Sequence, residues 1–179
     1  MITAQKIDRE QELLDLYSLY SDSILKYITM MIKDYHRAED LTHETFIRAF
    51  NKLNQGEQMI HPKTWLFSIA RNITIDYMRR QNKYRSLLNL FQSQIEASNE
   101  TERMYQIREE SVQLYKALTS LKESHREVII LRKIKEFSIL ETCQILGWSE
   151  SKVKNTLARG LKVLETKLLK EGIIYEENR

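Results

Sequence analysis

The chain has 179 residues, of which 42% are hydrophobic, so it can bury one or two small cores and is not globally disordered. It has only 4 glycines and 1 proline, and a β-rich fold usually places more of both in its turns, so the composition favours an almost all-helical protein. Its 28 basic and 25 acidic residues leave a net charge of +3, a total that is less informative than its distribution along the chain.

Apolar residues recur at intervals of three and four along three segments of the first half of the chain. Such spacing predicts helices, here at 7–33, 37–53 and 64–85. Ile47 is one of the apolar positions of the second helix. Between the second and third helices, Gly56 and the sole proline, Pro62, make 54–63 the best loop candidate.

The periodicity weakens from Ser86 onward, where Ser, Asn, Gln and Glu accumulate, and we interpret 86–105 as a flexible interdomain linker. The domains on either side are then 1–85 and 106–172, followed by a tail at 173–179. Acidic residues outnumber basic ones toward the far end of this linker, which is typical of a solvated connector.

Two helix starts in the second domain have the pattern of a capping box, a serine followed three residues later by a glutamate. The first pair is Ser124 and Glu127, ahead of the apolar run 128–131, and the second is Ser138 and Glu141. Both patterns predict helix N-termini.

A tight turn joins two predicted helices in the stretch FSILETCQILGWSESKVKNTLARGLKVL. Gly147 suits the left-handed conformation that ends a helix, and Ser149 is a good N-cap that places Glu150 at the positive end of the next helix. The resulting three-residue turn has the spacing of a helix-turn-helix motif. We expect Cys143 to be a small buried residue where the two helices cross. Because it is the single cysteine of the chain, an intramolecular disulfide is excluded.

The helix after this turn has an apolar stripe and a polar remainder. The expected inward positions are Val153, Leu157, Leu161 and Leu164. The outward positions are Ser151, Lys152, Lys154, Asn155, Ala158, Arg159 and Lys162. Long cations can reach DNA phosphates, and serine and asparagine can bond to base edges. A basic face alone is as consistent with simple solvation, but the capped helix, the glycine turn and the basic helix together favour DNA binding.

A second cationic segment lies in the third predicted helix, where five basic residues and only one acidic residue occur between 71 and 86. They are Arg71, Arg79, Arg80, Lys83 and Arg85, with Asp76 among them. Aromatic residues interleave with these cations, a combination that suits unpaired DNA. Trp65 and Tyr77 fall on the apolar stripe and are expected in the core, whereas Phe67 and Tyr84 are the better candidates for exposure.

Catalytic constellations are absent from the sequence. The four histidines do not form a metal-ligand spacing with cysteine, the carboxylate–histidine pattern DLTHE occurs once, and no phosphate-binding glycine loop or nucleophile elbow is present. We therefore predict no enzyme activity, no cofactor and no metal site. No signal-peptide core and no apolar run of the roughly 20 residues that span a membrane is present, so a cytoplasmic protein is expected.

Three motifs in this order resemble the extracytoplasmic-function (ECF) sigma factors of the bacterial sigma-70 family, within which the chain is most similar to SigX-like members. The motifs are AEDLTHETFIRAF, KTWLFSIARNITIDYMRRQ and LRKIKEFSILETCQILGWSESKVKNTLARGLKVLE. The resemblance implies two helical domains, like sigma regions 2 and 4, that bind core RNA polymerase and direct it to promoters, in this group often those of a stress or envelope regulon.

The resemblance also implies a role for each motif. The first would dock on the β′ clamp helices through Asp40, Leu41, Glu44, Phe46 and Arg48. The second would recognise and melt the −10 element through Arg71, Asn72, Asp76, Arg79, Arg80 and Lys83, where Asp76 either contacts the element or orients an arginine. The third would read the −35 element through Ser149, Ser151, Lys152, Lys154, Asn155, Ala158 and Arg159. The loop 54–63 would capture a flipped −10 base, and the second domain would also contact the β flap.

The predicted −35 helix departs from the common family pattern. Ser151 and Lys152 stand where many members have Gly-Thr, and Asn155 and Thr156 stand where Ser-Arg is frequent. Ala158 replaces a frequent histidine. These changes keep the helix but leave the −35 sequence open.

A two-domain helix-turn-helix repressor or activator is the alternative function. Such a regulator normally needs a dimer interface or effector pocket, whereas the first half of this chain offers a basic helix and an acidic face. The family resemblance further implies a membrane-anchored anti-sigma factor as partner, which would hold the chain at the membrane.

Overall fold

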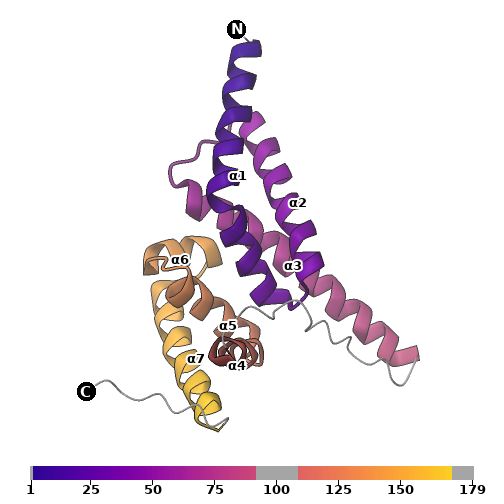
Figure 1. The fold of residues 1–179 in the computed structure, drawn as a ribbon, viewed down its shortest axis with the longest axis vertical. Coiled ribbons are helices and arrows are strands. Elements are labelled where there is room, and N and C mark those ends of the chain that lie inside the picture. The colour runs from indigo at the N-terminus through magenta and orange to yellow at the C-terminus, as the bar shows by residue number, and fades with distance from the viewer. Residues whose placement is uncertain (1, 92–108, 171–179) are drawn as a thin grey trace. The chain divides into compact units, whose positions relative to one another are not determined.

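The computed structural model of the chain describes residues 2–91 and 109–170, and every regular element in these two stretches is a helix. They divide into two compact units (Figure 1). The first comprises α1 (Ile2–Ile32), α2 (Tyr35–Asn54) and α3 (Pro62–Phe91). The second comprises α4 (Glu109–Thr119), α5 (Glu123–Ile129), the π-helical turn η1 (Ile130–Ile134), most of α6 (Ile139–Leu146), and α7 (Glu150–Lys170). The predicted all-α fold with two small domains is confirmed.

The core of the first unit forms where α1 packs against both α2 and α3, and α2 packs against α3. Tyr27 of α1 and Phe67 of α3 are fully buried, with ring centroids 5.5 Å apart. The prediction that Phe67 is exposed is therefore wrong, because α3 buries a face wide enough to include it. Trp65 and Tyr77, expected in the core, are each only half-buried.

Buried threonines in this unit satisfy their hydroxyl groups within their own helices. The Thr42 hydroxyl donates to the carbonyl of Ala38 at 2.7 Å, and Thr45 and Thr74 make the same bond to the carbonyl four residues earlier. A polar side chain without such a partner would destabilise the core. The unit therefore accommodates threonine at buried positions.

The boundaries of α3 differ from those predicted. It begins at Pro62, a residue well suited to the first turn of a helix, and it continues to Phe91. The first six residues of the predicted linker, 86–91, thus belong to the helix, and they include no glycine or proline that would end it. The remaining linker positions and the predicted tail lie outside the described residues.

In the second unit, α7 packs mainly against α5 and also against α4. The two helices α5 and α7 approach closely at Gly160, where an added Cβ would lie 3.1 Å from the Cβ of His125. The chain leaves α5 through η1, whose end is marked by a bond from the Lys135 N–H to the Ile130 carbonyl at 2.8 Å. Glu136 then adopts a left-handed conformation with φ 59°.

The first of the two predicted capping boxes is wrong. Helix α5 begins at Glu123, one residue before Ser124, and its N-cap position is Lys122, which makes no side-chain cap bond. Glu127 does not fold back over the helix end, because its side chain is buried in the unit, only 2% exposed. Beside it, the buried Arg126 guanidinium donates to the Thr119 carbonyl at 2.9 Å and ties the end of α4 to α5.

Candidate functional site

The helix-turn-helix geometry is built by local caps at both sides of the turn. Ser138 and Glu141 form the predicted capping box at the start of α6: the Ser138 N–H donates to the Glu141 carboxylate at 2.7 Å, and the Glu141 N–H donates to the Ser138 hydroxyl at 3.2 Å. Gly147 ends α6 in the left-handed conformation with φ 65°. The Ser149 hydroxyl accepts from the Lys152 N–H at 3.3 Å and starts α7. This motif is therefore confirmed as predicted.

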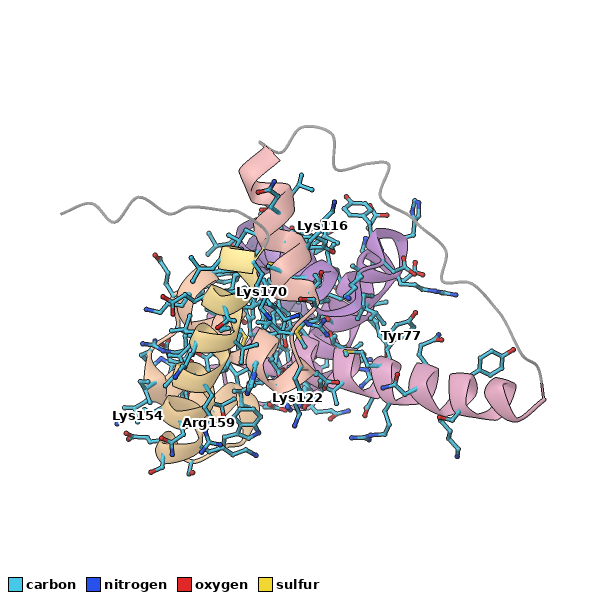
Figure 2. All side chains as sticks on the ribbon, turned by 90° about the horizontal axis from the view of Figure 1, so that it is seen from below. Tyr77, Lys116, Lys122, Lys154, Arg159 and Lys170 are labelled. Carbon is cyan, nitrogen blue, oxygen red and sulfur yellow. The ribbon has the colours of Figure 1, made fainter. Side chains whose placement is uncertain are left out.

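The exposed face of α7 holds all the residues predicted for DNA contact in this helix. Ser151, Lys152, Lys154, Asn155, Ala158 and Arg159 are exposed, as is Ser149 just before the helix. Figure 2 shows Lys154 and Arg159 on the first half of α7. On the opposite side Val153 and Leu164 are buried against the unit, and Leu157 and Leu161 are half-buried.

The cations on this face differ in their local partners. The Lys154 ammonium pairs with Glu150 at 2.9 Å, and this hydrogen bond and the Glu150 charge raise the pKa of Lys154. The Lys152 ammonium lies 4.2 Å from the ring centre of Trp148, a cation–π contact. Arg159 makes no ion pair with any residue in the described parts of the chain. This role of Trp148 was not predicted from the sequence, although the four-residue spacing between Trp148 and Lys152 is a signal for it.

A second exposed cationic stripe runs along α3. Asn72, Arg79, Arg80 and Lys83 are exposed, while Arg71 and Asp76 are half-buried. Positions 72, 76, 79, 80 and 83 recur at helical intervals of three and four and share one face. Asp76 pairs with Arg79 at 3.2 Å, so its carboxylate orients that arginine.

Tyr84 adds an aromatic surface next to this stripe. Its side chain is 61% exposed, as expected, and it follows Arg80 by one helical turn. Tyr77, labelled on α3 in Figure 2, lies one turn before Arg80 and is half-buried. Aromatic rings between cations offer stacking faces beside a charged backbone track, which is the chemistry of single-strand binding.

The residues predicted to dock on core polymerase from α2 are of two kinds, exposed and buried. Asp40 and Arg48 are exposed and Glu44 is half-exposed, and Arg48 and Glu44 form an ion pair. Leu41 and Phe46 are buried, at 7% and 4% exposed, so their side chains do not reach the surface of this unit. Phe46 packs edge-on against Tyr17 of α1, with ring centroids 4.8 Å apart.

Ile47 lies on the same surface and was expected on the apolar face of its helix. Its side chain is 61% exposed, and it follows Asp40 and Glu44 by seven and three residues. These intervals put the three side chains on one stripe of α2. A single exposed apolar residue is common on protein surfaces, and the position of Ile47 on the stripe of Asp40 and Glu44 makes it the apolar candidate of this surface.

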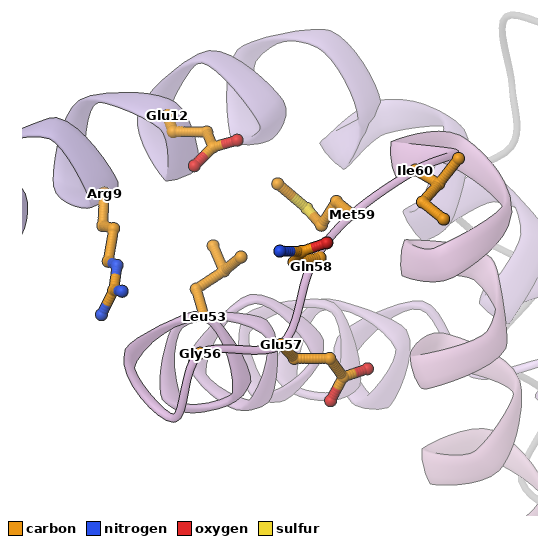
Figure 3. A pocket seen from close by; sticks show the side chains of 8 residues that line it. All are labelled: Arg9, Glu12, Leu53, Gly56, Glu57, Gln58, Met59 and Ile60. Carbon is orange, nitrogen blue, oxygen red and sulfur yellow. The ribbon is translucent and has the colours of Figure 1, made fainter.

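The loop between α2 and α3, at 55–61, borders a pocket of about 450 Å³. Figure 3 shows Arg9 and Glu12 of α1 on one side of it and the loop residues Glu57, Gln58 and Met59 on the other. The Arg9 guanidinium donates to the Asn54 carbonyl at 3.4 Å, which connects α1 to the end of α2.

Cys143 is half-buried rather than fully buried and carries a free thiol. In residues 2–91 and 109–170 no cluster of histidine, cysteine and acidic side chains could hold a metal ion. None of the helices in these stretches has the length and apolarity to cross a membrane.

The chain thus has two helical units, each with its own exposed cationic stripe, and the second unit contains a helix-turn-helix. Residues 16–84 match the family model for sigma-70 region 2, and residues 111–164 match the family model for sigma-70 region 4. The first match lies within the first unit, and the second match covers most of the helical part of the second unit.

Known relatives agree with these matches. The chain is 37% identical to the ECF RNA polymerase sigma factor SigX of Bacillus subtilis, over 92% of this chain and 88% of that protein. It is 34% identical to the RNA polymerase sigma factor YlaC of the same organism, over 87% and 91% of the two chains. Among solved structures, the sigma factor RpoE bound to the anti-sigma factor NepR from Bartonella quintana is 27% identical, with a TM-score of 0.72 over 90% of this chain and 97% of that one. The chain belongs to the ECF RNA polymerase sigma factors of the sigma-70 family.

Proposed function

We propose that this sigma factor works as two promoter-reading surfaces and one polymerase-docking surface. The α3 stripe would recognise and melt the −10 element, α7 would read the −35 element, and the α2 stripe would dock on the β′ clamp helices. The observation that carries this assignment is that the two exposed cationic stripes lie on separate units, one with an exposed aromatic ring and one on a capped helix-turn-helix. The protein itself would supply binding energy and no catalysis.

The direct test is transcription from a library of linear promoter fragments by core polymerase, with and without this protein. We expect initiation on a subset of promoters only when the chain is present. The free chain should bind duplex DNA weakly, whereas the alternative, a repressor, would bind its operator tightly without polymerase. Initiation that never depends on the chain, on any fragment, would contradict the proposal.

The assignment of α7 to the −35 element leads to a prediction for Arg159. Because its guanidinium is exposed and makes no ion pair within the described residues, Arg159→Ala removes a DNA contact without releasing an internal partner. We expect upstream promoter binding to weaken by about 1–3 kcal/mol if the side chain contacts a base. If it contacts a phosphate, the slope of log affinity against log salt should instead fall by about 1. An unchanged upstream footprint at every salt concentration would refute the placement of this helix.

The assignment of α2 to core docking leads to a prediction for Ile47. Ile47→Ala shortens an exposed side chain, so the fold should be unaffected, while affinity for core polymerase should fall roughly fivefold or more, as for a central interface residue. Leu19→Ala is the matched control, since Leu19 is a similarly exposed aliphatic residue on α1. Equal core affinities of Ile47→Ala, Leu19→Ala and the natural chain would count against this surface.

We further propose that an anti-sigma factor binds this chain and that its anchor holds the chain at the membrane. One structure similar to this chain is a sigma factor in complex with an anti-sigma factor, RpoE with NepR. Cell fractionation before and after induction would test the membrane association.

The resemblance also implies a contact of the second unit with the β flap.

A further inference from the structure

Glu57 connects the two helices that flank the loop 55–61. One carboxylate oxygen accepts a hydrogen bond from the Lys52 ammonium in the last turn of α2, at 2.6 Å. The other accepts from the indole N–H of Trp65 in the first turns of α3, at 2.7 Å. A single side chain in the middle of the connection is thus bonded to both of its ends.

The backbone around Glu57 reinforces this arrangement. The Glu57 N–H donates to the Lys52 carbonyl at 3.1 Å, and the Gly56 N–H donates to the Leu53 carbonyl at 3.0 Å. Gly56 has φ 87°, a left-handed conformation that glycine adopts without strain. The start of the loop therefore folds back onto the end of α2, and the Glu57 carboxylate extends the connection across to α3.

Beyond Glu57 the next three side chains of the loop line the pocket, and they differ in exposure. Ile60 is 81% exposed, and Gln58 and Met59 face the pocket shown in Figure 3. The hydrogen bonds from Lys52 and Trp65 lower the pKa of Glu57, so the carboxylate is ionised at neutral pH and both contacts persist there. The exposed ion pair is weak by itself, so the two directional contacts act on the shape of the loop more than on overall stability.

We propose that Glu57 is a positioning residue for promoter melting, which holds the loop 55–61 in the shape that receives an unpaired −10 base by bridging Lys52 and Trp65. This inference rests on the proposed recognition of the −10 element by the first unit and on the base capture that the family resemblance implies for the loop 54–63. Extruding a base from the duplex is energetically unfavourable, and a loop already held in its receiving shape loses less conformational entropy when the base binds. Glu57 would then raise the rate of melting without touching the base.

The first experiment measures hydrogen exchange of the loop amides in the free full-length chain. Glu57→Ala removes both contacts, and Trp65→Phe removes the indole N–H while keeping an aromatic ring. The amides of residues 56 and 57, which donate to carbonyls at the end of α2, should exchange roughly fivefold faster in both variants, as expected for loss of a weak exposed contact. Asp22→Asn is the matched control, because it neutralises an exposed carboxylate paired with Lys26 at 2.7 Å on α1. Unchanged loop exchange in both variants overturns the proposal.

The second experiment uses holoenzyme and promoter DNA with 2-aminopurine at successive non-template −10 positions. Fluorescence should rise more slowly with both variants than with the natural chain or Asp22→Asn, at equal core affinity and equal thermal stability. Faster loop exchange with an unchanged fluorescence rate overturns the positioning role. If the natural chain gives no fluorescence change at any position, base capture itself is refuted. This outcome differs from failure of the Glu57 bridge, because in that case the natural chain still gives a fluorescence change.

Discussion

Replacing Phe67 by alanine should destabilise the first unit by about 3–5 kcal/mol, the usual cost of truncating a buried aromatic side chain. Phe67 is fully buried and its ring packs against Tyr27, which is also fully buried. A loss of this size is a large part of the roughly 5–15 kcal/mol that stabilises a typical domain. In any molecule whose first unit unfolds, the proposed −10 surface on α3 would be lost as well.

Urea unfolding of the full-length chain measures this effect. The chain has 2 tryptophans, Trp65 in the first unit and Trp148 in the second. In a Trp148→Phe background, Trp65 fluorescence reports the unfolding of the first unit alone.

Tyr84→Ala is the matched control, because it removes an exposed aromatic ring from the same helix as Phe67. Tyr84 is 61% exposed, so its removal should change the free energy of unfolding by less than about 0.5 kcal/mol. It should still slow promoter melting, because the exposed ring is a candidate stacking surface. A stable Phe67→Ala variant with a melting defect like that of Tyr84→Ala would show that Phe67 contacts DNA instead of filling the core.

Replacing Gly160 by valine should destabilise the second unit by about 1–3 kcal/mol, the typical cost of forcing extra atoms into a packed contact. The first added atom already lies 3.1 Å from the His125 Cβ and 3.2 Å from the Ile129 Cδ1, and valine adds two more carbons beyond it. Helices α5 and α7 must then separate. Thermal unfolding monitored by Trp148 fluorescence in a Trp65→Phe background measures the loss.

Ala158→Val places the same side chain on the exposed face of the same helix and is the matched control. It should lower stability only by the small helix-propensity difference of about 0.6 kcal/mol between alanine and valine. Equal stabilities of Gly160→Val and Ala158→Val would mean that α5 and α7 can move apart freely. Where Gly160→Val still folds, we expect a weaker upstream footprint, since α5 supports the helix that carries Arg159.

The features that sequence analysis predicted well are those with local causes. Gly147, Ser149 and the Ser138–Glu141 pair each determine the backbone of their own turn, and the structure confirms all three. The residues facing outward on α7 also follow from helical periodicity, because that helix is buried along one side. Such information lies within a few residues of the chain.

Burial on a helix with two partners was less predictable. Helix α3 packs against both α1 and α2, so its buried face is wider than one apolar stripe, and Phe67 falls within it. The Ser124 pattern failed for a related reason, since Glu127 is taken into the core instead of capping the helix. Both outcomes depend on tertiary packing.

A family motif also contains both residues that fill the core and residues that lie on the surface. The motif that suggested docking includes Leu41 and Phe46, which are buried, and Ile47, which is exposed. Side chains that are adjacent in a helical motif point in different directions, and only the packing of α1 on α2 determines which of them reach the surface. The proposed docking surface is therefore Asp40, Glu44, Ile47 and Arg48.

The internal partners of the α7 cations bear on how this protein would search a genome. Lys154 is paired with Glu150 and Lys152 lies over Trp148, so two cations of the reading face already interact within the protein. Nonspecific affinity comes almost entirely from cations that displace counterions from phosphates, and a genome presents a vast number of competing sites. Cations with internal partners gain less from an arbitrary stretch of DNA, so the unit would dwell briefly at wrong sequences and remain available for its promoters.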